Sequence, residues 1–156
     1  MKKIKLTKNK YTLVDDSDFE WLSQWKWHFS TSGHKSGNGY AARGDYSTSQ
    51  LVYMHRLILN LVDKELVTDH INGRGLDNRR CNLRAVTKAQ NYIGRAKRYN
   101  STNRYKGVRR NSGSKTWNAI ISFRGKSYYL GSFKTELGAR RVYLKAAKMY
   151  HGEFAR

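Results

Sequence analysis

The sequence is poor in cysteine, in long apolar runs and in acidic residues. Cys81 is the only cysteine, which excludes an intramolecular disulfide and any zinc site built on cysteine pairs. A lone cysteine favours, weakly, a reducing cytoplasmic setting. No apolar run approaches the length of a membrane-spanning helix, and no apolar segment follows the basic N-terminus. We therefore expect neither insertion into a membrane nor secretion.

The shortage of acidic residues leaves a large positive charge. Against 31 lysines and arginines stand 11 aspartates and glutamates, which gives 156 residues a formal net charge of +20. Such an excess repels itself, so a polyanionic partner is expected. Nucleic acid is favoured over a membrane surface, because the basic residues stand among Gly, Asn, Tyr and Trp and not along one amphipathic helix.

The N-terminal section, residues 1 to about 53, reads as short strands around one helix. Strands are expected at 4–6, 11–14, 27–30 and 40–43, the first two joined as a hairpin by the turn-like segment 8–10. Ser17 and Glu20 have the spacing of a capping box, which predicts a helix start. We expect Trp21, Trp25 and Trp27 to fill a core; base stacking is the less favoured alternative.

The middle section, from residue 54 to about 95, has the order helix, strand, long loop, strand, helix. The apolar positions of 55–61 share one helical face. A strand at 66–68 ends at Asp69 and His70, and a second strand begins at Asn82. A capping-box pattern at 87–90 predicts a helix with Asn91 at the end of its first turn.

The C-terminal section has a different pattern. A basic, polar linker at 96–104 precedes it. Residues 117–123 alternate between apolar and polar, which is strand periodicity, and 127–133 forms the partner strand. Thr135 is expected to cap a helix that ends at Gly152. The whole chain is therefore predicted to be α+β, with a C-terminal three-stranded antiparallel sheet packed on one helix.

Four polar residues of the middle section suit phosphodiester hydrolysis. That reaction needs a base to activate water and a cation to stabilise developing charge. Neighbours on a strand point in opposite directions, so Asp69 and His70 can serve a metal and a water respectively. Asn91 supplies a second oxygen ligand for a hard ion such as Mg²⁺. Asn82 is expected to hydrogen-bond the imidazole and fix its tautomer.

The same stretch resembles an HNH endonuclease of the phage homing type. The resemblance rests on Asp-His-Ile-Asn-Gly at 69–73, Asp-Asn-Arg at 77–79, Asn-Leu-Arg at 82–84 and Asn91. It implies a ββα-metal core around one divalent cation, a bacterial or phage-infected cell, and the four roles given above. Asparagines stand where colicin-like nucleases have histidine ligands, which favours Mg²⁺ or Mn²⁺ over zinc. His55 is expected to be structural, with a supporting role in the site as the alternative.

The last section resembles the ethylene-response-factor (Apetala-two) DNA-binding domain. The resemblance rests on segments 105–109, 117–121 and 129–133 and on the helix that ends in His-Gly-Glu-Phe-Ala. It implies that the sheet lies in the major groove of DNA. The expected DNA contacts are Lys106, Arg109, Arg124, Lys126 and Tyr129. Tyr129 replaces a tryptophan and Ser122 an arginine of the plant domain, so base preferences do not carry over.

Together these features predict a site-specific, metal-dependent DNA endonuclease. Its nuclease domain would span 1–95, with the core at about 54–95, and its DNA-binding domain 105–156. It would act on double-stranded DNA as a monomer or homodimer, with one Mg²⁺ or Mn²⁺ and no small-molecule cofactor. A DNA-binding regulator with an inert HNH remnant is the alternative. RNA or ribosome binding fits the charge but not the spacing of the metal-site residues.

Overall fold

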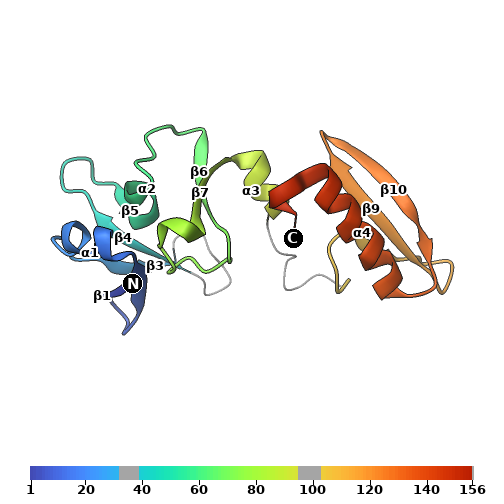
Figure 1. Ribbon diagram of the computed structural model, residues 1–156, viewed down its shortest axis with the longest axis horizontal. Coiled ribbons are helices and arrows are strands. Elements are labelled where there is room, and N and C mark those ends of the chain that lie inside the picture. Colours follow the sequence, from blue (N-terminus) through green and yellow to red (C-terminus); the bar gives the residue numbers. More distant parts are fainter. Residues whose placement is uncertain (32–38, 95–102, 156) are drawn as a thin grey trace. The chain divides into compact units, whose positions relative to one another are not determined.

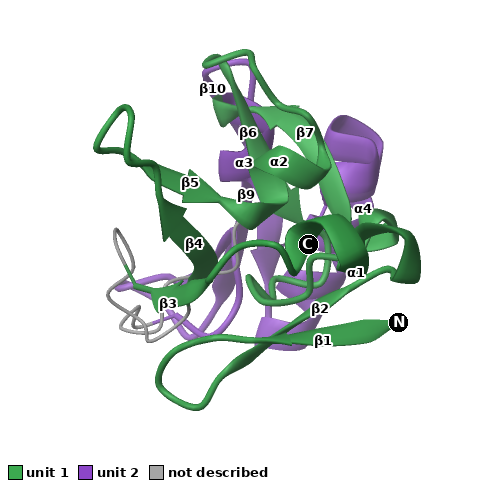
Figure 2. Ribbon diagram, turned by 90° about the vertical axis from the view of Figure 1, so that its left-hand side faces the viewer, with its two compact units in different colours: residues 1–88 green, residues 89–156 purple. Residues whose placement is uncertain are grey.

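A computed structural model describes residues 1–31, 39–94 and 103–155. The chain divides into two compact units, Met1–Lys88 and Ala89–Arg156 (Figure 2). Both combine small antiparallel sheets with helices, which confirms the α+β class (Figure 1). No helix in the described ranges is long and apolar enough to cross a membrane. The predicted domain boundary at 95/96 and most of the predicted linker lie outside these ranges and stay predictions.

The first unit is built from three small antiparallel sheets and two short helices. In chain order the elements are β1 (Lys2–Lys5), β2 (Tyr11–Val14), α1 (Asp16–Leu22), β3 (His28–Ser30), β4 (Tyr40–Gly44), β5 (Leu51–Tyr53), α2 (Met54–Ile58), β6 (Leu66–His70) and β7 (Leu83–Thr87). The sheets are β1–β2, β3–β4–β5 and β6–β7. The expected N-terminal hairpin is confirmed, and β5 is a strand that the sequence pattern did not indicate.

Helix α1 begins earlier than the capping box predicts. Its N-cap is Asp15 and not Ser17. Asp18, inside the expected capping box, is instead buried and paired with Arg80, with Oδ1 2.8 Å from the guanidinium Nη2. Asp18, an inner position of the predicted capping box, thus lies inside the helix and forms a tertiary ion pair.

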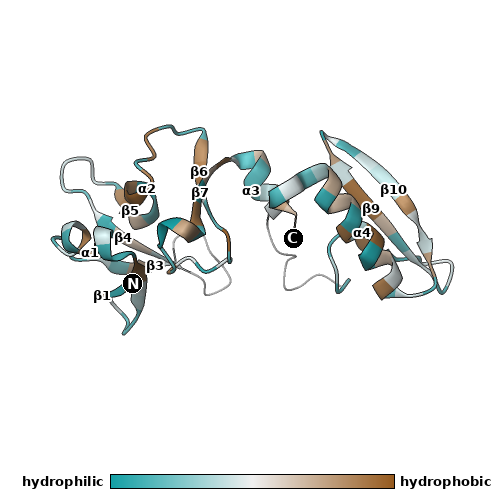
Figure 3. Ribbon diagram, in the orientation of Figure 1, coloured by the Kyte–Doolittle hydropathy of each residue, from teal (hydrophilic) through white to brown (hydrophobic). Residues whose placement is uncertain are grey.

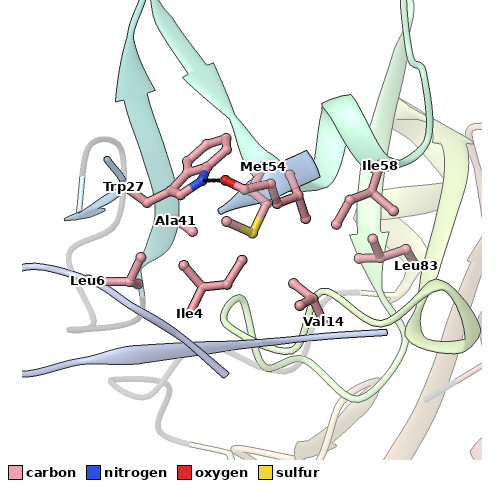
Figure 4. Packing of buried hydrophobic residues seen from close by; sticks show 9 residues of the cluster. Ile4, Leu6, Val14, Trp27, Ala41, Met54, Ile58 and Leu83 are labelled. Atoms are coloured by element: carbon pink, nitrogen blue, oxygen red, sulfur yellow. Dashed lines mark hydrogen bonds between the residues drawn. The ribbon is translucent and has the colours of Figure 1, made fainter. Parts of the chain in front are cut away.

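The core of the first unit lies between the N-terminal hairpin, α1 and α2. Figure 4 shows Ile4 and Val14 of the hairpin beside Met54 and Ile58 of α2. Trp27 is 4% exposed and donates its indole N–H to the carbonyl of Leu22 at 2.8 Å. The expectation that a tryptophan fills this core is confirmed for Trp27. Trp25, however, is 36% exposed.

The second unit contains a three-stranded antiparallel sheet and a long helix. Helix α3 (Lys88–Gly94) comes first, followed by β8 (Val108–Arg110), β9 (Trp117–Phe123), β10 (Lys126–Phe133) and α4 (Glu136–His151). The central strand is β9. Its apolar residues and those of α4 form the core, and both elements carry brown positions in Figure 3.

Two local signals set the position of α4. The Thr135 hydroxyl accepts a hydrogen bond from the amide of Gly138 at 3.1 Å, so the predicted N-cap is confirmed. Gly107 has φ +69° and lies against the ring of Tyr143, where an added Cβ would come within 2.1 Å of the ring. This glycine therefore satisfies a left-handed backbone conformation and a close approach of strand to helix at once.

Candidate active site

Asp69 and His70 occupy the last two positions of β6. Because neighbours on a strand point to opposite faces, the two side chains enter different surroundings. Asp69 pairs across the hairpin with Arg84 of β7, which donates from Nε at 2.9 Å and from Nη2 at 2.7 Å to the same carboxylate oxygen. Both Asp69 and His70 are buried. The hairpin register thus places a carboxylate held by an arginine next to an imidazole.

His70 is held by Asn78, whose Oδ1 lies 2.9 Å from Nε2. The orientation of this amide follows from its other partner, Thr12. The Thr12 hydroxyl donates its single proton to the carbonyl of Leu76 at 2.9 Å, so it accepts from the Asn78 amide nitrogen, also at 2.9 Å. The carbonyl side of Asn78 therefore faces the imidazole and accepts from Nε2–H. In this neutral tautomer, Nδ1 carries the lone pair of His70.

The His70 ring lies among three other rings. It stacks with Tyr40 at a centroid distance of 5.6 Å and meets His55 edge-on at 5.2 Å. His55 in turn stacks with Tyr53 at 5.5 Å. Tyr40 of β4 and His55 of α2, the latter stacked on Tyr53 of β5, thus limit how the imidazole can turn.

Burial keeps both histidines neutral. It is the largest cause that lowers the pKa of His70, although the bond to Asn78 and the charges of Asp69 and Asp77 partly oppose it. Burial is also the largest cause that lowers the pKa of His55 to about 3, and electrostatic interactions with His70 and Arg56 add to it. The His55 Nδ1 atom is buried without a hydrogen-bond partner in the described residues. His70 is therefore a neutral base at pH 7, and His55 a neutral ring beside it.

Asn82 has a different role from the one expected. It lies in the 3₁₀ turn Arg80–Asn82 before β7 and not on that strand. Its side chain accepts from the amide of Asn72 at 2.9 Å and donates to the carbonyl of Asp77 at 2.7 Å. Asn82 therefore closes the loop between β6 and β7, and the bond to the imidazole that we assigned to it is made by Asn78.

Asp77 stabilises the same loop with its carboxylate. It accepts from Arg79 Nε and Nη2, both at 2.7 Å, and from the side-chain amide of Asn72 at 2.8 Å. The bond from Arg79 is the largest cause that holds the pKa of Asp77 below its usual range. Asp77 therefore locks this turn. Its neighbour Asn78, which holds the imidazole, is the residue that sequence reasoning missed.

Asp69 is the carboxylate expected to bind a metal. The described residues contain no group of three His, Cys, Asp or Glu that could hold a metal. Mg²⁺ is held by one or two carboxylates together with water and phosphate oxygens. The single carboxylate of Asp69 fits that requirement. Asn91, the second expected ligand, is on α3 within Ala89–Arg156, and its pairing with Asp69 stays a prediction.

The second unit presents two of the five expected DNA contacts on one face of its sheet. Ala119 and Ile121 are buried against α4, so the alternate residues of β9 face away from the helix. Arg109 lies opposite Asn118, and Tyr129 opposite Ile120, which places both on that outer face. Arg109 is exposed and Tyr129 is 62% exposed.

The other three expected contacts have different positions. Lys126 lies opposite Phe123, whose side of the sheet is the helix side. Arg124 is in the turn between β9 and β10, with φ 50° and its guanidinium 5.1 Å from the Phe123 ring centroid. Lys106 donates from Nζ to the carbonyl of Ile93 at the end of α3. Of the five expected DNA contacts, only Arg109 and Tyr129 are therefore placed on the outer face of the sheet.

A search for similar proteins links the chain to one with a named activity. The "Uncharacterized HNH endonuclease L560" of Acanthamoeba polyphaga mimivirus is 29% identical over 153 residues, which are 95% of this chain and 74% of the relative. The similarity spans both units. No family model matches the chain. No solved structure matches it.

Proposed function

We propose that this chain is a metal-dependent endonuclease that hydrolyses phosphodiester bonds in DNA. The observation that carries the proposal is the state of His70, which is buried, neutral and held through Nε2 so that Nδ1 is the basic nitrogen. A neutral imidazole beside a carboxylate is what activation of a water nucleophile needs. The mimivirus relative, named an HNH endonuclease, supports the same reaction class.

Each residue of the site has a proposed part. His70 Nδ1 takes a proton from the attacking water, while Asn78 and the surrounding rings hold the imidazole in place. Asp69 and Asn91 would hold one Mg²⁺ or Mn²⁺, which supplies charge stabilisation at the leaving oxygen when it is bound. Arg84 holds the Asp69 carboxylate in its orientation before DNA arrives. Asn82 and Asp77 hold the loop that carries Asn78.

The second unit is proposed to select the DNA site. Arg109 and Tyr129 share an exposed face with the polar side chains of Asn118 and Ser122. A small twisted sheet can present such groups to base edges in the major groove. A single nuclease site cuts one strand per engagement, so we expect a monomer to nick DNA and a homodimer to be able to break both strands.

Replacement of His70 tests the reaction. With Mg²⁺ and supercoiled phage or bacterial DNA, His70→Ala is expected to cut about 10²- to 10⁴-fold more slowly than the wild type, which is the range for a positioned acid–base group. His28→Ala removes a histidine of β3 and serves as control. DNA binding should be equal in all three proteins. Cutting by His70→Ala at the wild-type rate would refute the assignment, and a wild type that binds but never cuts would favour a regulator.

A further inference from the structure

The first unit has a basic surface that the proposed nuclease site does not use. Five lysines fall within the first ten residues, on or between β1 and β2. Lys2 pairs with Glu20 at 3.3 Å. The others, Lys3, Lys5, Lys8 and Lys10, have no acidic partner within the described part of the chain. Their charge is thus available to a ligand.

A groove runs beside this hairpin. It is lined by Lys3 and Lys5 of β1, by Phe19 of α1, and by Trp25, Lys26 and Trp27 of the segment that enters β3. Trp25 is the unusual residue, because its large ring stays 36% exposed while Trp27 is 4% exposed. The groove therefore combines unpaired cations with an aromatic rim.

Trp25 also holds a further cation. The Arg43 guanidinium lies 4.8 Å from the centroid of its ring, and Trp25 itself meets Trp21 and Trp27 edge-on. Arg43 Nη1 donates to the carbonyl of Gly44 at 3.3 Å, and Nε is buried without a hydrogen-bond partner in the described residues. The ring and this hydrogen bond thus fix the position of the guanidinium charge.

We propose that this groove binds the phosphate backbone of DNA through Lys3, Lys5 and Lys26, with Arg43, held on the Trp25 ring beside the groove, as a further cation. Alternate residues of a strand recur every ~6.8 Å, about the axial rise of two nucleotides of one DNA strand. Lys3 and Lys5 can therefore follow phosphates that lie two nucleotides apart along one strand. The inference rests on the proposed DNA partner, but it does not need the chain to cut.

Hydrogen bonds connect the hairpin beside the groove to the loop of the nuclease site. Leu13 of β2 donates to the carbonyl of Leu76 and accepts from the amide of Asn78, both at 2.8 Å. Thr12 joins the same loop through its side chain. A DNA strand held on the hairpin is thus anchored to the element that positions His70, so binding there would set the register of the cut.

The test is the salt dependence of binding to a DNA duplex of about 30 base pairs, without divalent metal. Lys5→Gln/Lys26→Gln is compared with Lys64→Gln/Lys145→Gln, which removes two exposed lysines elsewhere. Loss of two phosphate contacts should lower the slope of log K against log salt by about 1.8, and the control should retain the wild-type slope. Trp25→Leu keeps every charge, and by releasing Arg43 it should lower the slope by up to about 0.9.

The outcomes separate the inference from the proposed function. Equal affinities and slopes for the groove and control variants would overturn the groove while leaving the nuclease proposal intact. A wild-type chain that does not bind the duplex would overturn both. Thermal melting of each variant shows whether a loss of binding reflects the groove or the fold. Lys26→Gln, which changes one exposed side chain, should still lower the slope if the double variant is unstable.

Discussion

The two units use charge in opposite ways. Residues 1–88 contain 15 lysines and arginines with nine acidic residues, and residues 89–156 contain 16 with two. In the first unit, Asp18, Asp69 and Asp77 are buried and each is paired with an arginine. In the second unit, two carboxylates can neutralise only a few of 16 cations. Buried ion pairs therefore hold the candidate site of the first unit in place. Most positive charges of the second unit have no carboxylate to neutralise them, so they can attract a polyanion.

This difference has an energetic side. A buried carboxylate that loses its partner is costly, commonly by about 3–5 kcal/mol, because a desolvated charge remains. The arginine–aspartate pairs thus make the loop between β6 and β7 intolerant of change. An exposed cation on a sheet contributes little to folding and much to long-range attraction. Substitutions in the buried ion pairs of the first unit should therefore affect cutting, whereas substitutions of exposed cations, on the second unit or in the groove of the first, should affect affinity.

After His70→Ala, the largest effect that would separate the units is expected from Asn78→Ala. Without its acceptor, the Nε2 proton of His70 is no longer fixed, so cutting should slow by about 10- to 100-fold, as for other groups that orient a catalytic residue. DNA affinity should not change. Asn72→Ala removes an asparagine of the same loop that does not bond the imidazole, and it should cut faster than Asn78→Ala. Equal rates for these two variants would contradict the role of Asn78.

Asn78 also shows where sequence reasoning ended. The motif that contains it marked the right loop, and the strand pattern placed Asp69 and His70 at a strand end, which the structure confirms. Neither the motif nor the strand pattern revealed which asparagine faces the imidazole, because Asn78 is oriented by Thr12, 66 residues away in the chain. A contact of that separation leaves no periodic signal.

Sequence patterns predicted those contacts whose two partners are close together in the chain. Thr135 caps α4 because its partner is three residues away. Lys106 is the opposite case: the structure pairs it with the carbonyl of Ile93, thirteen residues away, which no local pattern indicated, and its contact with DNA stays a prediction. The Tyr40 and Tyr53 rings around His70 come from a sheet of which β5 was not foreseen.

A second expected difference concerns acid. The pKa of His55 is about 3 in the folded chain and about 6.5 when unfolded. The unfolded state therefore binds the extra proton first, and stability is lost as the pH falls from about 6.5 toward 3. Between pH 7 and 5 this should cost the first unit about 2 kcal/mol. Urea titrations should show that His55→Phe loses correspondingly less, and an unchanged pH dependence would contradict the burial of a neutral His55.

A smaller effect, on affinity alone, is expected from Arg109→Ala. Removal of an arginine that reads a base edge should weaken specific binding by about tenfold, while a lost phosphate contact would instead lower the salt slope by about 0.9. The rate of cutting at saturating protein should not change. Arg141→Ala, on the exposed side of α4, is the matched control. If both variants bind equally well, the outer face of the sheet is not the reading surface.

The smallest expected effect tests whether the two units unfold independently of one another. Thr135→Ala removes the hydroxyl that accepts from Gly138, and loss of such a cap costs about 1 kcal/mol. Hydrogen exchange measured by mass spectrometry should show faster exchange in peptides of β9, β10 and α4. Peptides of the hairpin β6–β7 should exchange as in the wild type, because their stability comes from the pairs around Asp69 and Asp77. Faster exchange in both sets of peptides would mean that the two units unfold together. The different uses of charge in the two units would then belong to one cooperatively folding protein.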